Sequence, residues 1–375
     1  MYLIETKKLK SALERLWLAV PKKGGLPVLE NFRWRVVNGQ LNLTATDLDN
    51  SVLISVPFLT RPAKDSLDVL VPAKELYQAV KSESAPSLTV RINDSKFEVR
   101  ADRRVLALSW TEPKNFPRIP EGELRVRGRL LSSSLATALE KALFCVSTEE
   151  SRYSINDVKL EMRNSLFRVI GTDGHRLSVV EGAAKNGTGP GFETLLLRST
   201  ATILASLQVS GECAWTQFST CEPDDKQEFN LFVMPDGSMV IARRGQGTFP
   251  NYEKVMPQAP LEGKVIFSRA ELLDGLSKLS ATVRKKENSP VHFEFSKKPP
   301  VIVAENDGTA NQIALEHSRI SGKTRDVGFN HQYLTQYVKS LETETVSMAL
   351  FPKAISEAAL FETFRYRHLL MPLRD

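Results

Sequence analysis

One pattern of apolar residues recurs three times along the chain and restricts its fold more than any other feature. Apolar side chains at offsets of 0, 4, 7 and 11 residues occur at Leu9, Leu13, Leu16 and Val20, at Leu135, Leu139, Ala142 and Val146, and at Leu272, Leu276, Leu279 and Val283. This spacing places apolar side chains on one side of an α-helix. Three amphipathic helices in one register indicate three copies of one structural unit.

The segments that follow each helix also recur. An alternating strand, a short polar turn and a second strand are predicted within residues 32–49, 157–176 and 291–309. These hairpins end in Thr46-Asp47, Thr172-Asp173 and Asn306-Asp307. A second helix is then expected within residues 71–80, 197–207 and 329–341, and further alternating strands follow.

The repeats predict an α+β fold of three tandem domains. Phe-Pro stretches beginning near Asn115 and Thr248 have the composition of linkers, because proline fixes the chain and interrupts regular elements. We therefore expect domains at residues 1–124, 125–259 and 260–375. Each should hold two helices packed on antiparallel sheets of about eight strands, since alternating strands suit sheets with one solvated face.

Composition restricts the class of protein. No apolar run approaches the length that crosses a bilayer, and the N-terminus lacks a secretory apolar segment. Three cysteines without framework spacing favour a reducing compartment, so a cytoplasmic protein is expected. The net charge of +6 permits a polyanionic partner without requiring one.

Basic residues recur at one position of the repeated helices, six residues after the start of each stripe and away from it. Those residues are Arg15, Lys141 and Lys278. One interpretation is an ordinary solvated helix face. The other is a shared surface for nucleic-acid phosphates, which would hold a duplex without reading its sequence. The sequence contains no helix-turn-helix, zinc-finger or RNP motif that would read bases.

The stretch from Thr172 to Ser178 permits two interpretations. Asp173, His175 and Ser178 have the residue types of a hydrolase. However, the equivalent turns lack the histidine and share the aspartate, which favours an Asp-stabilised turn with Gly174 in a left-handed conformation. Histidine and cysteine spacings fit no metal site, and phosphate-binding glycine motifs are missing, so no cofactor is expected.

Several ordered motifs resemble the bacterial DNA polymerase III β subunit family of sliding clamps along the whole chain. The matching stretches are LTATDLD at 43–49, NFPRIP at 115–120, SRYSINDVKLE at 151–161, TDGHRLSVV at 172–180, FPNYEKVMP at 249–257, VGFNHQYL at 327–334 and LLMPLR at 369–374. The resemblance implies three domains of the DNA-clamp fold in a non-catalytic subunit of DNA polymerase III. A specialised clamp paralogue with an antibacterial or repair partner remains an alternative.

The resemblance further implies a head-to-tail homodimeric ring that encircles double-stranded DNA for replication and repair. Its DNA-facing residues would be Lys7, Lys10, Arg15, Lys22, Lys23, Lys74, Lys81, Lys141, Arg152, Tyr153, Arg198 and Lys278. Thr282 and Val283 would approach the partner subunit.

A hydrophobic pocket for short linear motifs of the replicative polymerase, the clamp loader and repair proteins is also implied. Carried onto this chain, it would use Ile155, Thr172, Gly174, His175, Arg176, Leu177, Pro250, Lys254, Val255, Met256, Asn330, Tyr333, Leu369, Met371, Pro372, Leu373 and Arg374. Lys254 and Leu373 depart from the Arg and Met that are usual in the family, so the preferred peptide is expected to differ.

Overall fold

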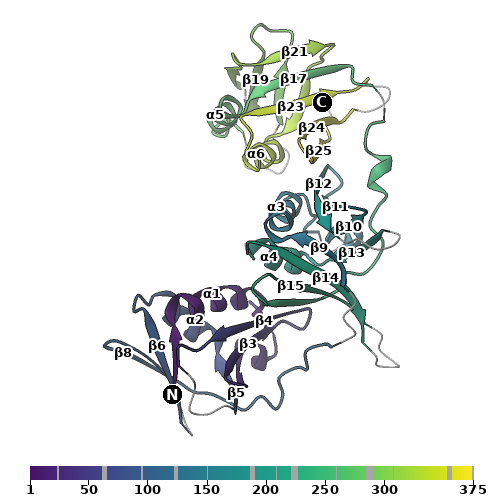
Figure 1. Ribbon diagram of the computed structural model, residues 1–375. Coiled ribbons are helices and arrows are strands. Elements are labelled where there is room, and N and C mark those ends of the chain that lie inside the picture. The colour runs from purple at the N-terminus through teal and green to yellow at the C-terminus, as the bar shows by residue number, and fades with distance from the viewer. Residues whose placement is uncertain are drawn as a thin grey trace.

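The computed structural model describes residues 1–373 apart from 23–24, 61–65, 94–95, 122–125, 150, 186–190, 208, 221–226, 259, 284–289, 307 and 353–356. The described residues form three similar repeats of helices and antiparallel strands, placed one after another (Figure 1). The longest helix in these ranges has 12 residues, which is too short to cross a bilayer.

The first repeat has eight strands and two α-helices in its described part. In chain order these are β1 (Tyr2–Glu5), α1 (Thr6–Leu16), β2 (Asn31–Val37), β3 (Gln40–Thr46), β4 (Asn50–Pro57), β5 (Ser66–Pro72), α2 (Ala73–Lys81), β6 (Ser87–Ile92), β7 (Phe97–Ala101) and β8 (Arg104–Leu108). Two short 3-10 helices follow α1, at Trp17–Ala19 and Pro27–Glu30.

The second repeat has the same order of elements. They are β9 (Val126–Leu131), α3 (Ser132–Leu143), β10 (Val158–Arg163), β11 (Leu166–Thr172), β12 (Arg176–Lys185), β13 (Phe192–Leu196), α4 (Arg198–Ser206), β14 (Glu212–Ser219), β15 (Glu228–Val233) and β16 (Met239–Arg243). The 3-10 helix η3 (Tyr153–Ile155) follows α3, and η4 (Tyr252–Lys254) lies in the linker to the third repeat.

Among the described residues, the third repeat contains one strand more than the others. Its elements are β17 (Gly263–Ser268), α5 (Arg269–Leu279), β18 (Pro290–Glu294), β19 (Val301–Asn306), β20 (Thr309–Ala314), β21 (Arg319–Gly322), β22 (Val327–Asn330), α6 (His331–Lys339), β23 (Thr345–Leu350), β24 (Ala359–Thr363) and β25 (Tyr366–Leu370). The additional strand β21 pairs with β17, so the expectation of about eight strands was one short here.

The predicted helices and hairpins are confirmed, but the first helix of each repeat ends before the last residue of its apolar stripe. Leu9, Leu13 and Leu16 are fully buried under α1, and each such side chain contributes about 2 kcal/mol when removed from water. Val20 follows the helix and precedes Pro21, which disfavours helical backbone at the residue before it. In the second repeat Val146 likewise lies in the turn beyond α3.

Every strand pairing among the described residues is antiparallel, and each repeat contains the same two four-stranded orders. In the first repeat these orders are β1-β6-β7-β8 and β5-β2-β3-β4. The turn between β2 and β3 uses Asn38 and Gly39, both at positive φ (52° and 73°), as predicted for a two-residue hairpin.

Strand pairing also joins the repeats to each other. The fourth strand of the first repeat, β4, pairs with the last strand of the second, β16. The fourth strand of the second repeat, β12, pairs in the same way with the last strand of the third, β25. Both junctions therefore continue a sheet from one repeat into the next.

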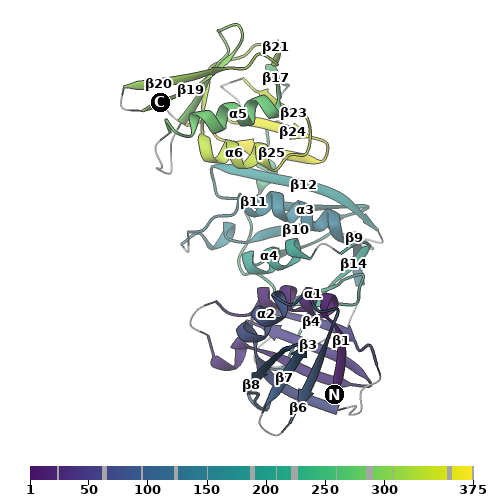
Figure 2. The same ribbon diagram turned by 90° about the vertical axis from the view of Figure 1, so that its left-hand side faces the viewer.

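The three repeats together form a bent row. In Figure 1 the six α-helices lie along its concave side, and Figure 2 looks onto that side, with the helices in front of the sheets. The sheets form the opposite, convex surface. The helices of all three repeats therefore lie on the same side of the molecule.

Candidate functional site

The turn between β11 and β12 is built by its own side chains. Thr172 donates its hydroxyl to the carbonyl of Arg176 (2.7 Å) and accepts the amide of Gly174 (3.1 Å). One carboxylate oxygen of Asp173 accepts the amides of His175 and Arg176, each at 3.0 Å. Gly174 has a φ of +88°, where a side chain would strain the backbone. The sequence TDG therefore specifies this turn locally.

The first repeat contains the same device. The hydroxyl of Thr46 donates to the carbonyl of Asn50 (2.9 Å), and Asp47 accepts the amides of Asp49 (3.1 Å) and Asn50 (2.6 Å). The prediction of an Asp-stabilised turn is confirmed in both repeats. Its counterpart in the third repeat, Asp307, lies outside the described residues.

The hydrolase interpretation is wrong. Ser178 is fully buried and donates its hydroxyl to the carbonyl of Lys141 on α3 (2.8 Å), whereas His175 is exposed. The carboxylate of Asp173 binds backbone amides and the Nε of Arg176 (2.8 Å). A nucleophile, base and orienting acid must converge, and these three groups point to different surroundings.

Arg176 connects the turn to two helices. Its Nε donates to Asp173, its Nη1 donates to the side-chain oxygen of Gln336 on α6 (2.5 Å), and its Nη2 donates to the carbonyl of Phe144 at the end of α3. The guanidinium also lies 3.9 Å from the ring centroid of Tyr333. A planar group with donors along three edges suits this site, and a lysine ammonium could not replace it.

The C-terminal tail runs beside the turn. The amide of Met371 donates to the carbonyl of His175 (2.9 Å), and the amide of Leu373 donates to the carbonyl of Gly328 (2.9 Å). Leu369 is directly opposite Leu177 in the β12–β25 pair. The tail thus lies between residues of the second repeat and residues of the third.

Most residues of the predicted pocket gather around this meeting of turn and tail. Leu177, Met256 and Leu369 share one apolar cluster. Asn330 caps α6, because its side-chain oxygen accepts the amide of Tyr333 (3.1 Å). The ring of Tyr333 in this first turn lies against the guanidinium of Arg176. These contacts join side chains from three segments that are distant in sequence.

The other predicted pocket residues differ in exposure. Ile155 is buried in η3, beside Arg152, whose Nη1 donates to the carbonyl of Asp173 (3.0 Å). Pro250, Lys254 and Val255 are exposed on the linker, Pro372 is half-buried, and Met371 is 42 % exposed. Arg374 lies outside the described residues.

Behind the turn lies a buried aromatic cluster that the sequence did not single out. His368 of β25 is fully buried and stacks on Tyr337 of α6, with ring centroids 4.5 Å apart. Its Nδ1 lies 3.8 Å from the Sγ of Cys145. Burial, aided by the charge of Arg176, lowers the pKa of His368 to about 3, so the imidazole is neutral at pH 7.

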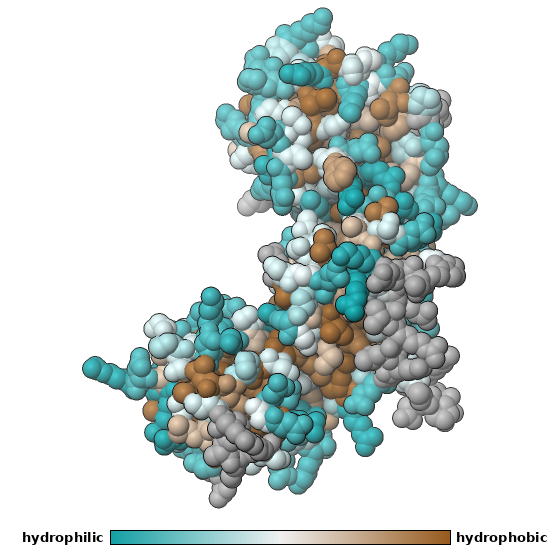
Figure 3. All heavy atoms as spheres, in the orientation of Figure 1, coloured by the Kyte–Doolittle hydropathy of each residue, from teal (hydrophilic) through white to brown (hydrophobic). Residues whose placement is uncertain are grey.

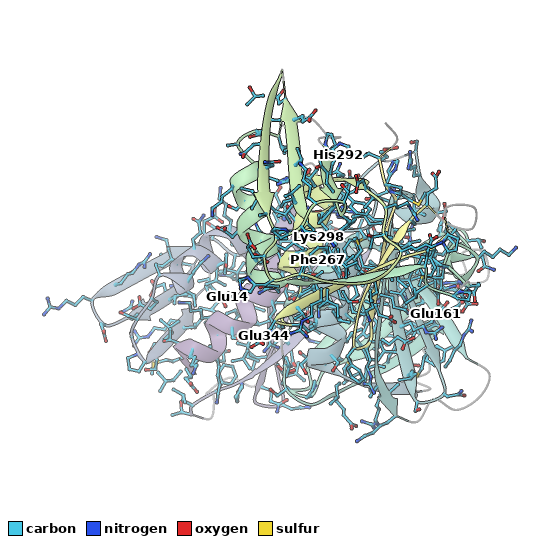
Figure 4. All side chains as sticks on the ribbon, turned by 90° about the horizontal axis from the view of Figure 1, so that it is seen from above. Glu14, Glu161, Phe267, His292, Lys298 and Glu344 are labelled. Atoms are coloured by element: carbon cyan, nitrogen blue, oxygen red, sulfur yellow. The ribbon has the colours of Figure 1, made fainter. Side chains whose placement is uncertain are left out.

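The linker between the second and third repeats covers the convex face of their junction. Phe249, Tyr252 and Met256 are buried in the same apolar cluster as Leu177. The hydroxyl of Tyr252 donates to the buried carboxylate of Glu161 (3.0 Å), which also binds Lys159 (2.9 Å). Viewed from above, Glu161 lies on the sheet side of the molecule and Glu14 lies at helix α1 (Figure 4).

The structure places the basic residues of the helices in three kinds of environment. Arg15 binds Asp236 of the second repeat (2.6 Å), and Lys278 binds Asp274 on its own helix (2.6 Å). Lys141 is half-exposed, with its Nζ 5.4 Å from the ring centroid of Tyr366. Exposed cations from the predicted set are Lys7, Lys22, Lys74, Lys81, Arg152 and Arg198, and Lys10 is half-exposed.

Two further residues belong to the predicted DNA-facing set. Lys23 and the Tyr153 side chain lie outside the described part of the chain. Arg152 also pairs with Glu149 (2.8 Å), so its charge is already partly balanced.

Comparison with known proteins agrees with this geometry. Residues 1–120 match the DNA polymerase III beta subunit N-terminal domain, and residues 129–220 match the central domain of that subunit. The Beta sliding clamp of Pseudomonas putida is 25% identical over 379 residues, covering 100% of this chain and 99% of its own length.

Solved structures have the same fold over the full length. A sliding clamp of Pseudomonas aeruginosa, solved bound to griselimycin, superposes with a TM-score of 0.87 at 23% identity, covering 100% of this chain and 99% of its own. The DNA polymerase III beta subunit of Thermotoga maritima gives 0.85 at 20% identity with the same coverage. The chain therefore belongs to the DNA polymerase III beta subunit family, the sliding clamps, which are non-catalytic processivity factors.

Proposed function

We propose that two copies of this chain close head to tail into a ring around duplex DNA, and that the ring holds partner proteins at the turn and tail of the second and third repeats. The three domains of each copy would be residues 1–124, 125–259 and 260–375. The observation that carries it is the shared rule of the two internal junctions. In both, the fourth strand of one repeat pairs antiparallel with the last strand of the next.

Applied once more, this rule pairs β20 of one copy with β8 of another. Both are edge strands of their four-stranded sheets in the described structure. Every residue of β20 is exposed or half-exposed, and so are four of the five residues of β8. Exposed edges favour pairing with another chain. A heterologous contact of this kind closes into a ring when its rotation suits, and the bend of the chain supports closure by two copies.

The predicted subunit contacts lie close to this edge. Asn311 of β20 donates its side-chain amide to the hydroxyl of Thr282 (3.4 Å), and Val283 is half-buried beside it. Thr282 therefore contacts the edge strand through Asn311. In this proposal β8 and β20 make the contact between subunits, and Thr282 and Val283 lie close to it.

The helix-lined concave surface would face the DNA. Exposed lysines of α1 and α2, together with Arg198 of α4, offer charges that neutralise phosphates without reading bases. Arg15 and Lys278 contribute less than the sequence pattern suggested, because Asp236 and Asp274 already bind them. Encirclement would provide retention that such weak contacts alone do not.

The site for partner motifs would lie between the turn and the tail. Met371 and Leu373 would offer apolar surface, and exposed His175 would offer a polar group at its edge. Leu177 and Arg176 are buried, so they would form the floor of the site and hold its shape. Apolar walls with a few polar groups and a flexible methionine suit short motifs from several partners, including polymerase, clamp loader and repair proteins.

Solution mass tests the ring. We expect a particle of twice 41.9 kDa at micromolar concentration by light scattering. Replacing the exposed β8 residues Val105→Asp and Ala107→Asp should give a folded monomer, because two charges oppose edge pairing. The control is Val105→Thr with Ala107→Ser, which keeps the edge uncharged. A wild-type monomer, or a dimer that survives both aspartates, would refute the β8–β20 contact.

Truncation tests the partner site. Removing residues 371–375 should weaken binding of a fluorescent QLxLF-type peptide by at least about tenfold, since the truncation deletes one wall of the site. The truncated chain should still be a dimer by light scattering. Unaltered peptide affinity would refute the site while leaving the ring proposal intact.

A further inference from the structure

We propose that the convex face at the junction of the first and second repeats is a second docking groove, which binds an extended peptide carrying large apolar side chains and neighbouring acidic residues. The groove has a volume of about 1090 Å³. Its base contains Phe218, Phe229, Leu231 and Ile241. Figure 3 shows hydrophobic residues gathered over this junction. The inference does not depend on ring closure or on the turn-and-tail site.

The base is preorganised by its own packing. The rings of Phe218 and Phe229 stack, with centroids 5.6 Å apart and planes 19° from parallel. They occupy facing positions of the β14–β15 pair, next to Ile241 of β16, which pairs with β4 of the first repeat. Because these residues stand on paired strands, the base requires little ordering when a ligand binds.

The walls of the groove keep apolar surface in contact with solvent. Leu53 of β4, Ile119 of the linker and Met239 of β16 are only partly buried against the base. Met239 adds a flexible thioether that adapts to differently shaped side chains. An apolar patch of this extent beside polar residues is a feature of interaction sites.

At the junction of the second and third repeats, the linker covers the convex face. There the linker buries Phe249, Tyr252 and Met256 against the sheet. In the described part of the first linker, Ile119 alone packs on the corresponding cluster. Phe116 is buried outside this cluster, beside the groove-lining Arg33, whose guanidinium lies 5.7 Å from its ring centroid. The first junction therefore retains a hydrophobic surface that a peptide could cover.

The charged residues at the rim of the groove indicate which peptides it would bind. Arg33 is bound by two hydrogen bonds to Asp68, at 2.9 and 2.6 Å, so its charge is balanced. Arg35 lies 3.8 Å from the same carboxylate and its side chain is 54% exposed. Arg118 is also exposed at the rim, and Glu121 is the one acidic residue among the groove-lining residues that the structure describes. Arg33, Arg35 and Arg118 thus face the two carboxylates of Asp68 and Glu121, and this excess of positive charge among the described residues favours acidic side chains beside the apolar ones.

Selection from a random library tests this groove without assuming a partner. A phage-displayed library of 12-residue peptides is selected on the full-length chain, and each recovered peptide is then measured by fluorescence anisotropy. We expect a class rich in large apolar residues with Asp or Glu. Its affinity should fall about tenfold on the Arg35→Glu, Arg118→Glu double variant, because both rim charges are reversed.

Two further variants identify the site that each peptide uses. The Arg91→Glu, Lys96→Glu variant reverses two exposed charges elsewhere in the first repeat, one on β6 and one just before β7, and should bind this class normally. The variant that lacks residues 371–375 should also bind it normally, which separates the groove from the turn-and-tail site. Failure to recover any peptide sensitive to the rim reversal, or recovery of basic peptides only, would overturn the proposal.

Discussion

At the first junction, the residue that ends the Thr-Asp turn is Asn50, whose side chain donates to Ser199 (2.9 Å) and accepts from Thr200 (2.5 Å), both on α4. At the second junction the same position holds Arg176, which reaches α6 of the next repeat and α3 of its own. The same backbone turn thus carries an asparagine in the first repeat and an arginine in the second. The neutral amide joins two repeats, whereas the guanidinium joins them and also lies at the edge of the proposed partner site.

The linkers that follow the first and second repeats also differ in how many apolar side chains they bury. The second linker buries three apolar side chains and anchors Tyr252 on Glu161, while in the described part of the first linker Ile119 alone packs on the corresponding cluster. The difference indicates that the second junction is the more tightly closed on its convex face. The partly buried apolar residues of the first junction line the groove that we propose as a docking site.

The largest expected effect comes from Arg176→Ala. This substitution removes three hydrogen bonds and leaves Asp173 without its buried cation, so the free energy of unfolding should fall by about 3–5 kcal/mol. Urea denaturation measures the loss. Arg176→Lys should recover less than half of it, because an ammonium group cannot reproduce the three directions. A loss below about 1 kcal/mol would contradict the central position given to this residue.

Acid should destabilise the second junction through His368. Its folded-state pKa of about 3 lies below the usual 6.5, so the folded state favours the neutral form. This contribution is present above pH 6.5 and is lost as pH falls from 6.5 toward 3, at about 1.4 kcal/mol per pH unit. Comparing wild type with His368→Gln between pH 7 and 4.5 isolates the effect. Identical slopes for the two proteins would rule it out.

The first junction should respond more weakly. Asn50→Ala removes the bonds to Ser199 and Thr200 and leaves buried hydroxyl groups to find other partners, at a cost of about 2 kcal/mol. Ser199→Ala removes one of these bonds and should cost less. If Asn50→Ala were as damaging as Arg176→Ala, the proposed difference between the junctions would disappear.

The smallest effect is expected in the second linker. Tyr252→Phe deletes one buried hydroxyl and its hydrogen bond to Glu161, at a cost of about 1 kcal/mol. The ring remains to cover the sheet, so peptide binding at the turn and tail should not change. Loss of peptide binding in this variant would show that the linker does more than cover the junction.

The features that the sequence predicted correctly are local ones. Helical stripes, hairpins and the Thr-Asp turn depend on residues within about one helical turn or one strand pair of each other. Arg15 pairs with Asp236, which lies 221 positions away in the sequence. No local sequence pattern indicates that this carboxylate lies beside Arg15 in the folded chain. The burial of His368 and the extra strand β21 depend in the same way on how separate segments pack.

The candidate site shows the same limit. The TDGHRL stretch and the tail were recognisable as motifs, yet the contacts of Arg176 with Gln336 and Tyr333 required the third repeat to be placed. The groove at the first junction was not indicated by sequence, because it is lined by residues of two repeats that meet where β4 pairs with β16.

Retention on DNA of defined topology tests the ring most directly. After loading onto a nicked circular plasmid, the protein should stay bound through gel filtration in moderate salt, and a single cut that linearises the plasmid should release it from the ends. The Val105→Asp, Ala107→Asp variant should not be retained on either DNA. Equal retention of the wild-type protein on circular and linear plasmid would contradict encirclement.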